Sequence, residues 1–180
     1  MSPLLIIING HPGTGKTTLA HRLSKELKLP VMCKDEVKEI LFDRLGWSTK
    51  EWSQKLSLAS YGIIDYVMEN ALSIGAGFII ESNFIAKYDS ERMKKLIEKC
   101  NARAVQVVLH CNEVVRSERF RDRSMSGNRH AGHHDLDQAQ EHLEGEKRIP
   151  LSIDIPLIEV DTTDFEKINY PEILDRIRVI

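Results

Sequence analysis

Residues 10–17 read G-H-P-G-T-G-K-T, and this stretch decides how the rest of the chain is interpreted. It fits the phosphate-binding loop pattern G-x-x-x-x-G-K-[ST] at every specified position. The apolar block Leu4–Ile8 precedes it and has the composition of a buried parallel strand. After it, Leu19, Leu23 and Leu27 recur at the i, i+4, i+8 spacing of a helix. Strand, glycine loop and helix are the context that confirms such a motif.

The residue types of this loop suit an anionic ligand. Glycines let the backbone approach a phosphate closely, and successive amide N–H groups form a nest for an anion. A helix beginning near Lys16 adds the positive end of its dipole. We expect Lys16 to reach the β- and γ-phosphates of a nucleotide and the Thr17 hydroxyl to bind Mg²⁺. The nucleotide-binding residues predicted here are Gly10, His11, Pro12, Gly13, Thr14, Gly15, Lys16, Thr17 and Thr18.

The bulk composition is that of an ordinary globular chain. Its 180 residues predict one domain over residues 1–180. A net charge of −2 gives no overall attraction to nucleic acid or acidic membranes, although it leaves room for a local basic groove. The three cysteines lack C-x-x-C spacing, so we expect reduced thiols and a cytoplasmic protein. No apolar run reaches membrane-spanning length, and the first apolar block is interpreted as a core strand rather than a signal peptide.

Short apolar strands alternate with helical patterns along the chain. Further strands are predicted at 29–33, 78–80, 104–109 and 157–160, and helices at 35–45, 51–74, 89–100, 113–125, 135–147 and 171–180. This alternation predicts an α/β fold, in which a parallel sheet carries helices on both faces.

Two acidic residues follow strands of this sheet. Asp35 stands where the second strand meets a helix, a place where ligands gather in open α/β sheets, and we predict that it is catalytic. It also suits the helix N-cap, a role that does not exclude catalysis. Glu81 closes the third strand, where an acidic residue orients Mg²⁺ beside a phosphate loop; the alternative is a solvated charge at a strand end. Thr17 and Glu81 are the predicted metal ligands.

The helix at 113–125 and the segment after it are rich in arginine. Arg119 and Arg123 share one face of this helix, and like charges at that spacing are unfavourable on a bare surface. We therefore expect these arginines to contact an anionic ligand. Residues 126–134 read S-G-N-R-H-A-G-H-H, which predicts a mobile segment rather than a core element and, with its flanks, a lid at about 124–136.

Histidines and tryptophans allow further interpretations. His130, His133 and His134 with Asp135 suggest a zinc site, but their spacing matches no standard pattern and no cysteine joins them. A lid that faces a phosphate or an acceptor is the preferred reading. Trp47 and Trp52 either belong to the core, which we favour, or line an acceptor pocket.

With these residues in place, the chain resembles the small P-loop kinases of the nucleoside-monophosphate-kinase type. It is most similar to the group that spans gluconate kinases, the kinase domain of bacteriophage polynucleotide kinase, chloramphenicol phosphotransferase and zeta toxins, among AAA-type ATP-binding proteins. The resemblance covers nearly the whole chain and rests on residues 10–17 and on the order of the other elements. It implies three layers around a five-stranded parallel sheet of order 2-3-1-4-5.

The resemblance also implies roles for single residues. An Asp at the end of the second strand is the general base in several members, and Asp35 matches it. In the pattern E-R-x-x-x-R, formed here by Glu118, Arg119 and Arg123, the first arginine packs on adenine and the second reaches phosphates. Arg129 is similar to lid arginines that clamp the transferring phosphoryl group. The loop after the last strand contacts the base through its backbone, here at Asp161, Thr162 and Thr163. The implied catalytic set is Lys16, Asp35, Arg123 and Arg129. One departure is Glu81, where Asp is commoner.

The predicted function is an ATP- and Mg²⁺-dependent kinase that phosphorylates a hydroxyl of a small molecule. Sugar acids, nucleosides and antibiotic-like compounds are the acceptor classes considered. A polynucleotide 5′-hydroxyl kinase is an alternative, weakened because aromatic residues make up 6% of the chain and none clusters near the arginines. An alternative of another class is a nucleotide-binding switch or ATPase, against which Asp35 argues because a switch needs no acceptor base. The acceptor, the choice of ATP over GTP, acceptor contact by the lid histidines and the oligomeric state stay open.

Overall fold

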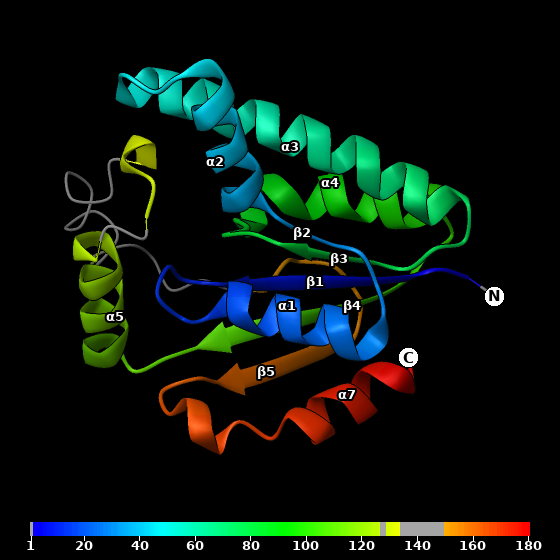
Figure 1. Cartoon of the computed structure of the whole chain (residues 1–180). Helices are drawn as coiled ribbons and strands as arrows, with labels where there is room; N and C mark the ends of the chain where they lie inside the picture. Colours follow the sequence, from blue (N-terminus) through cyan, green and yellow to red (C-terminus); the bar gives the residue numbers. More distant parts are fainter. Residues whose placement is uncertain (1, 127–128, 134–149) are drawn as a thin grey trace.

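The computed structural model describes residues 2–126, 129–133 and 150–180 and has three layers, with a sheet between two layers of helices (Figure 1). All strand pairs that the described residues form are parallel, and the order of the sheet is β2-β3-β1-β4-β5. The predicted α/β class and strand order are therefore confirmed. The strands are β1 (Leu4–Gly10), β2 (Val31–Cys33), β3 (Phe78–Glu81), β4 (Arg103–His110) and β5 (Leu157–Asp161).

The central strand β1 shows why five apolar residues follow one another in the sequence. Ile6 and Ile8 belong to the core on one face of the sheet, whereas Leu5 and Ile7 belong to the core on the other. All four side chains are fully buried. A strand covered by helices on both faces needs apolar side chains at every position, so its pattern does not alternate.

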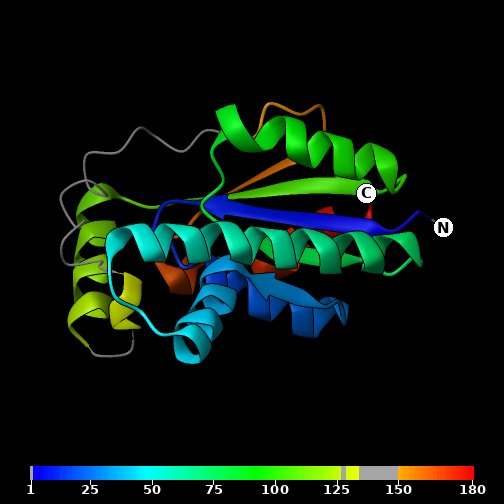
Figure 2. The ribbon, with the colours of Figure 1, turned by 90° about the horizontal axis from the view of Figure 1, so that it is seen from above.

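Helices cover both faces of the sheet (Figures 1 and 2). On one face, α1 (Lys16–Leu27) and α7 (Tyr170–Arg178) contribute core residues that include Leu23 and Ile177. On the other face, α3 (Lys50–Ser73) and α4 (Ala86–Lys99) contribute core residues that include Met68 and Met93.

The remaining elements gather near the carboxyl ends of the strands. In Figure 1, α5 (Glu113–Met125) lies beyond the ends of β4 and β5, and the short η1 (Ala131–His133) lies between α5 and α2 (Lys34–Leu45). A second short helix, η2 (Phe165–Lys167), follows β5. The fold thus brings α5, η1 and η2 to the carboxyl ends of the strands, where the phosphate-binding loop begins.

Several details differ from the sequence predictions. α2 begins at Lys34 with Cys33 at its N-cap, so Asp35 lies inside the first turn, and its assignment as an N-cap was wrong. The reason is that β2 ends directly at Cys33, without an intervening loop residue. Trp47 is 49% exposed and is not a core residue. The helix predicted at 89–100 begins earlier, at Ala86. The helix predicted at 135–147 lies outside the described residues.

Two simpler expectations can also be compared with the structure. The three cysteines are free thiols, as predicted. Of the helices in the described part of the chain, none is both long and apolar enough to cross a membrane.

Candidate active site

The phosphate-binding loop connects β1 directly to α1, and two of its glycines are required by geometry. Gly13 and Gly15 have φ angles of +85° and +81°, which L side chains rarely adopt. A Cβ atom on Gly13 would lie 2.7 Å from the carbonyl oxygen of Arg116, and one on Gly15 would lie 2.6 Å from the ring of Phe165. α1 starts after Gly15 without a side-chain cap. Such a helix N-terminus is well suited to phosphate oxygens.

Three predicted residues meet at the first turn of α1. Thr17 Oγ1 donates a hydrogen bond of 3.0 Å to Glu81 Oε2, and Lys16 Nζ lies 3.9 Å from Glu81 Oε1. Lys16 Nζ also donates to the carbonyl oxygen of His11 at 2.8 Å, which holds its side chain over the loop. Burial raises the pKa of Glu81, and the positive charge of Lys16 opposes this shift. A hydroxyl next to a carboxylate offers the hard oxygen ligands that Mg²⁺ prefers, so these residues fit such an ion.

Two cavities lie beside this turn. The first, which we call the polar cavity, has a volume of about 200 Å³, and its wall includes Lys34, Ser53 and Asn83. The second, which we call the loop cavity, has a volume of about 420 Å³ and is lined by the phosphate-binding loop, Arg119 and Phe165. Five residues line both cavities: Lys16, Thr17, Asp35, Arg123 and Arg129. All four predicted catalytic residues are thus brought to the boundary between the cavities.

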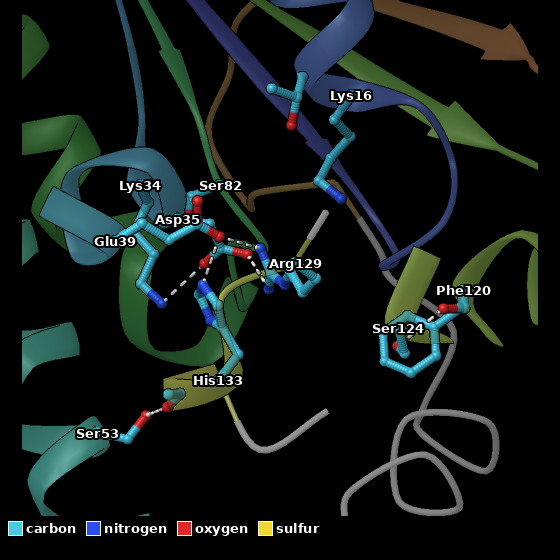
Figure 3. A network of polar contacts seen from close by, with 12 residues as sticks. Lys16, Lys34, Asp35, Glu39, Ser53, Ser82, Phe120, Ser124, Arg129 and His133 are labelled. Carbon is cyan, nitrogen blue, oxygen red and sulfur yellow. Dashed lines mark hydrogen bonds and ion pairs between the residues drawn. The ribbon is translucent and has the colours of Figure 1, made fainter. Parts of the chain in front are cut away.

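Asp35 is the centre of a network of charged groups (Figure 3). Arg129 donates from Nη2 to Asp35 Oδ2 at 2.7 Å and from Nη1 to Glu39 Oε1 at 3.2 Å. Lys34 Nζ donates to Asp35 Oδ1 at 3.2 Å. Burial by itself would raise the pKa of Asp35, but the charges of Lys34 and Arg129 hold that pKa well below its ordinary value. Asp35 is therefore an ionised carboxylate at neutral pH.

Of the predicted lid, residues 124–126 form the end of α5 and its C-cap, whereas residues 129–133 pack on α2 and α3. Gly132 and His133 are buried there, so the prediction that this segment is not part of the core was wrong for these two residues. The carbonyl oxygen of Gly132 accepts a hydrogen bond of 2.9 Å from Ser53 Oγ. The His130 ring stacks on Phe42 with 4.8 Å between ring centroids. His133 Nε2 lies 2.9 Å from Glu39 Oε1. The lid extends on both sides into residues that the structure does not describe.

The zinc hypothesis finds no support in these contacts. His130 faces Asp43 at 3.5 Å and His133 faces Glu39, so each imidazole has its own carboxylate partner. The other two members of the hypothetical site, His134 and Asp135, lie outside the described residues.

On α5, Arg119 connects the helix to the loop after β5. It donates to the carbonyl oxygens of Thr162 and Thr163 at 2.7 and 2.9 Å. Its guanidinium carbon lies 3.9 Å from the centroid of the Phe165 ring. Asp161 Oδ1 accepts from the backbone N–H of Thr163 at 2.8 Å, so its side chain braces the loop. These three loop residues line neither cavity, whereas Arg119, which donates to two of them, lines the loop cavity.

The other predicted loop residues divide into two groups. Pro12 lines the polar cavity and Thr18 the loop cavity. Thr14 Oγ1 donates to the carbonyl oxygen of His11 at 2.8 Å and thereby braces the loop from inside. Gly10 lies close to β4, because a Cβ atom there would be 2.8 Å from the carbonyl oxygen of Leu109.

Several cavity residues were missed in the sequence: Lys34, Lys38, Glu39, Asn83 and Phe165. Signals existed for some of them. Lys34 directly follows β2, and Asn83 follows Glu81 at the end of β3, positions where ligands gather in such sheets. Glu39 lies one helical turn after Asp35, on the same face of α2. Phe165 follows the loop after β5 and carried no recognisable signal.

A glycine loop at the end of β1, the Thr17–Glu81 pair and arginines over the strand ends define a P-loop protein of the nucleoside-monophosphate-kinase type. The chain belongs to the AAA domain family, whose sequence profile matches residues 5–145. Among curated proteins, none is significantly similar to it in sequence.

Solved structures agree with this assignment. A protein from Chloroflexus aurantiacus J-10-fl, described as a "putative kinase", is 35% identical, with 99% of this chain and 98% of that chain covered and a TM-score of 0.92. A gluconokinase from Sinorhizobium meliloti 1021 is 20% identical, with 98% and 90% covered and a TM-score of 0.52. The tunicamycin resistance protein of Deinococcus radiodurans is 20% identical, with 99% and 95% covered and a TM-score of 0.53. The last two similarities concern the fold alone.

Proposed function

We propose that this protein is an ATP-dependent kinase that transfers the γ-phosphoryl group to a hydroxyl of a small polar molecule. The observation that carries the proposal is that the two cavities meet at Lys16, Thr17, Asp35, Arg123 and Arg129. A kinase needs a donor site and an acceptor site that share one point, because the phosphoryl group passes between them in line. A switch or an ATPase needs only the first site.

The loop cavity is the proposed donor site. The amide groups of the glycine loop and the N-terminus of α1 would hold the phosphates, with Lys16 at the β- and γ-phosphates. Thr17 and Glu81 would hold Mg²⁺, which supplies charge neutralisation when bound. Arg119 and Phe165 form the far wall, where we place the base.

The polar cavity is the proposed acceptor site, and Asp35 is its general base. As the acceptor oxygen bonds to the γ-phosphorus, its proton passes to the Asp35 carboxylate. The bond between the γ-phosphorus and the β–γ bridging oxygen breaks, and its electron pair leaves with ADP. Lys16 and Arg123 line both cavities, so their charges can stabilise the transferring group between donor and acceptor.

Arg129 would act both on the transferring phosphoryl group and on the general base Asp35. While it is paired with Asp35, the low pKa of that carboxylate makes it a weak base. We propose that Arg129 moves to the γ-phosphate when the nucleotide binds. This movement would clamp the phosphoryl group and return the pKa of Asp35 toward its ordinary value in the same step.

A polynucleotide acceptor fits the polar cavity less well. Single-stranded nucleic acids are usually held by aromatic side chains on which the bases stack. Among the described residues that line this cavity, Phe120 is the only phenylalanine, tyrosine or tryptophan. A small acceptor is therefore favoured.

The test is phosphate transfer from γ-labelled ATP to a panel of small hydroxyl compounds. We expect the wild-type protein to label at least one compound and to release ADP faster in its presence, and Asp35→Asn to lose this labelling. ADP release that no acceptor accelerates, together with no labelled product, would support the ATPase alternative instead.

A further inference from the structure

Three side chains of the types that bind transition metals come together where α1, β2 and α2 meet. His21 belongs to α1, Cys33 is the last residue of β2, and Glu36 lies in the first turn of α2. Among the described residues, they form the one group of this kind whose donor atoms all lie within 4.8 Å of one another. None of the three takes part in the proposed phosphoryl transfer.

The local structure explains how this cluster forms. Cys33 is the N-cap of α2 and Glu36 is the third residue of that helix, so the carboxylate reaches back toward the thiol. Cys33 is buried in the same core cluster as Leu19 and Leu23, which brings α1 and its His21 against the end of β2. The cluster is therefore a product of the fold and has no local signature in the sequence.

The distances between the donor atoms suit a single metal ion. His21 Nε2 lies 2.7 Å from Glu36 Oε1 and 4.0 Å from Cys33 Sγ. The ligand atoms of a tetrahedral zinc ion are roughly 3.5 Å apart, since their bonds to the ion are about 2.0–2.3 Å long. The observed distances lie on both sides of this value, so small side-chain rotations would place all three atoms around one ion.

The site can be reached from solvent. The side chains of His21 and Glu36 are 45% and 47% exposed, whereas Cys33 is buried beneath the surface. An ion can therefore enter from outside and keep a water molecule as its fourth ligand. Three protein ligands and one water are the usual set of a zinc site that is not purely structural.

The charges around the thiol favour a cation. Burial, and then the carboxylates of Glu81 and Glu36, raise the pKa of Cys33. The same negative charges that disfavour a thiolate attract a divalent cation, and a thiol that coordinates such an ion loses its proton. Among the described residues, His21 is the only ion-pair partner of Glu36, so no lysine or arginine competes there with a metal.

We propose that His21, Cys33 and Glu36 bind a zinc ion. The proton of the Cys33 thiol passes to the solvent when the ion binds, and nothing is oxidised or reduced. Thiolate and imidazole ligands favour Zn²⁺, whereas Mg²⁺ prefers oxygen ligands such as those of Thr17 and Glu81. The two neighbouring sites therefore select different ions.

An ion in this site would join the two helices that carry the proposed catalytic groups. α1 holds Lys16 and Thr17 in its first turn, and α2 holds Asp35 in its first turn. Zinc would thus stabilise the folded protein and fix the start of α2 relative to α1. The zinc site does not depend on the proposed kinase function, because its ligands are not needed for the transfer.

Cobalt(II) is the spectroscopic probe, because it occupies zinc sites and absorbs by charge transfer when a thiolate binds it. The reduced, chelator-treated full-length protein is titrated with Co²⁺ in an excess of Mg²⁺, which fills the site of Thr17 and Glu81. We expect one equivalent per chain to produce the thiolate absorption, Zn²⁺ to displace it, and Zn²⁺ to raise the melting temperature. No thiolate absorption at one equivalent would overturn the inference.

Variants of the three ligands test which side chains hold the ion. Cys33→Ala should lose the thiolate absorption. His21→Gln and Glu36→Gln should each lower the affinity for Zn²⁺ at least roughly tenfold, measured by competition with a chromophoric chelator. Circular dichroism checks folding, and the two exposed positions carry the test if Cys33→Ala does not fold.

Two matched controls keep the cluster intact. Cys100→Ala removes another free thiol, and His110→Gln removes another histidine–glutamate pair, in which Nε2 lies 2.9 Å from Glu159 Oε1. Both should bind Zn²⁺ as the wild type does. Equal affinity in the control and ligand variants, or loss of the thiolate absorption in Cys100→Ala instead of Cys33→Ala, would place the ion elsewhere and refute the proposal.

Discussion

Arg129 and Asp35, which are 94 positions apart in the sequence, form an ion pair with 2.7 Å between Nη2 and Oδ2. The pair joins the described part of the lid to the first turn of α2, at the boundary of the two cavities. It also holds a proposed base in its ionised but weakly basic form. The proposed mechanism depends on breaking this contact.

Replacing Arg129 tests that dependence. In Arg129→Met, we expect the pKa of Asp35 to rise, because a cation that lowers it is removed. Turnover should nevertheless fall more than ATP affinity, since the clamp on the phosphoryl group is lost. The pKa is measured by carboxyl-carbon NMR titration and the kinetic constants by a coupled assay. Arg121→Met, on the exposed side of α5, is the control. An unshifted Asp35 titration would show that the ion pair does not set its basicity.

Asp35→Asn should cost roughly 10²–10⁴ in transfer rate, because the general base is lost while the amide keeps the shape of the side chain. ATP affinity should change little, since Lys16, Thr17 and Glu81 are untouched. The control is Asp43→Asn, an exposed carboxylate on the same helix. Transfer at the wild-type rate would place the base elsewhere, and a collapse of ATP affinity would make Asp35 a metal or nucleotide ligand.

The ionised Asp35 carboxylate should also make the thermal stability of the protein depend on pH. The pKa of Asp35 in the folded state lies below its ordinary value. At pH values above that ordinary pKa, the ionised carboxylate therefore stabilises the native state. This contribution disappears as the pH falls through the folded pKa. Thermal unfolding of wild type and Asp35→Asn should therefore differ most at neutral pH and converge in acid. A difference that does not shrink in acid would contradict the charged pairing.

Lys16→Ala should lower transfer by roughly 10²–10³ while leaving the melting temperature nearly unchanged, because its charge acts mainly in the transition state. Lys25→Ala is the control on the same helix, since Lys25 is exposed in the last turn of α1. Turnover near the wild-type value in folded Lys16→Ala would refute the assignment of residues 10–17 as a phosphate-binding loop.

Mg²⁺ affinity should increase with pH. Burial raises the pKa of Glu81, and only its ionised form is a good ligand for the ion. We therefore expect affinity for Mg²⁺ in the presence of nucleotide to keep rising with pH above the range in which an ordinary glutamate ionises. Glu81→Gln should bind more weakly and lose this pH dependence. An identical pH profile in wild type and Glu81→Gln would exclude Glu81 as the titrating ligand.

Arg119→Ala should weaken nucleotide binding with little effect on the turnover of the saturated enzyme. Its guanidinium contacts Phe165 and the loop after β5, away from the proposed point of transfer. Arg121→Ala is the comparison, and fluorescent-nucleotide titration is the measurement. A loss of turnover at saturating nucleotide would instead place Arg119 at the phosphoryl group.

The sequence predicted the elements of this fold well because their signals are local. A glycine loop between an apolar run and a helical repeat can be recognised from residues that are only a few positions apart. The same is true of the apolar run that forms β1. The helix start was predicted one residue late: β2 ends at Cys33, as predicted, but α2 begins directly at Lys34 with no loop residue between them. A helix that directly follows a strand starts where that strand leaves the sheet. The point at which the strand leaves depends on its pairing with neighbouring strands, which the local sequence does not show.

By itself, then, the sequence determined the phosphate-binding loop, the α/β architecture and the presence of carboxylates and arginines near the strand ends. Only the tertiary structure decided that Arg129 pairs with Asp35, that Lys38 and Asn83 face one polar cavity, and that Phe165 lies against Gly15 and Arg119. Each of these contacts joins segments that are far apart in the chain. The local sequence of either segment does not indicate that the two lie close together in space. Their positions follow from the packing of helices on the sheet, which brings distant strand ends to one edge.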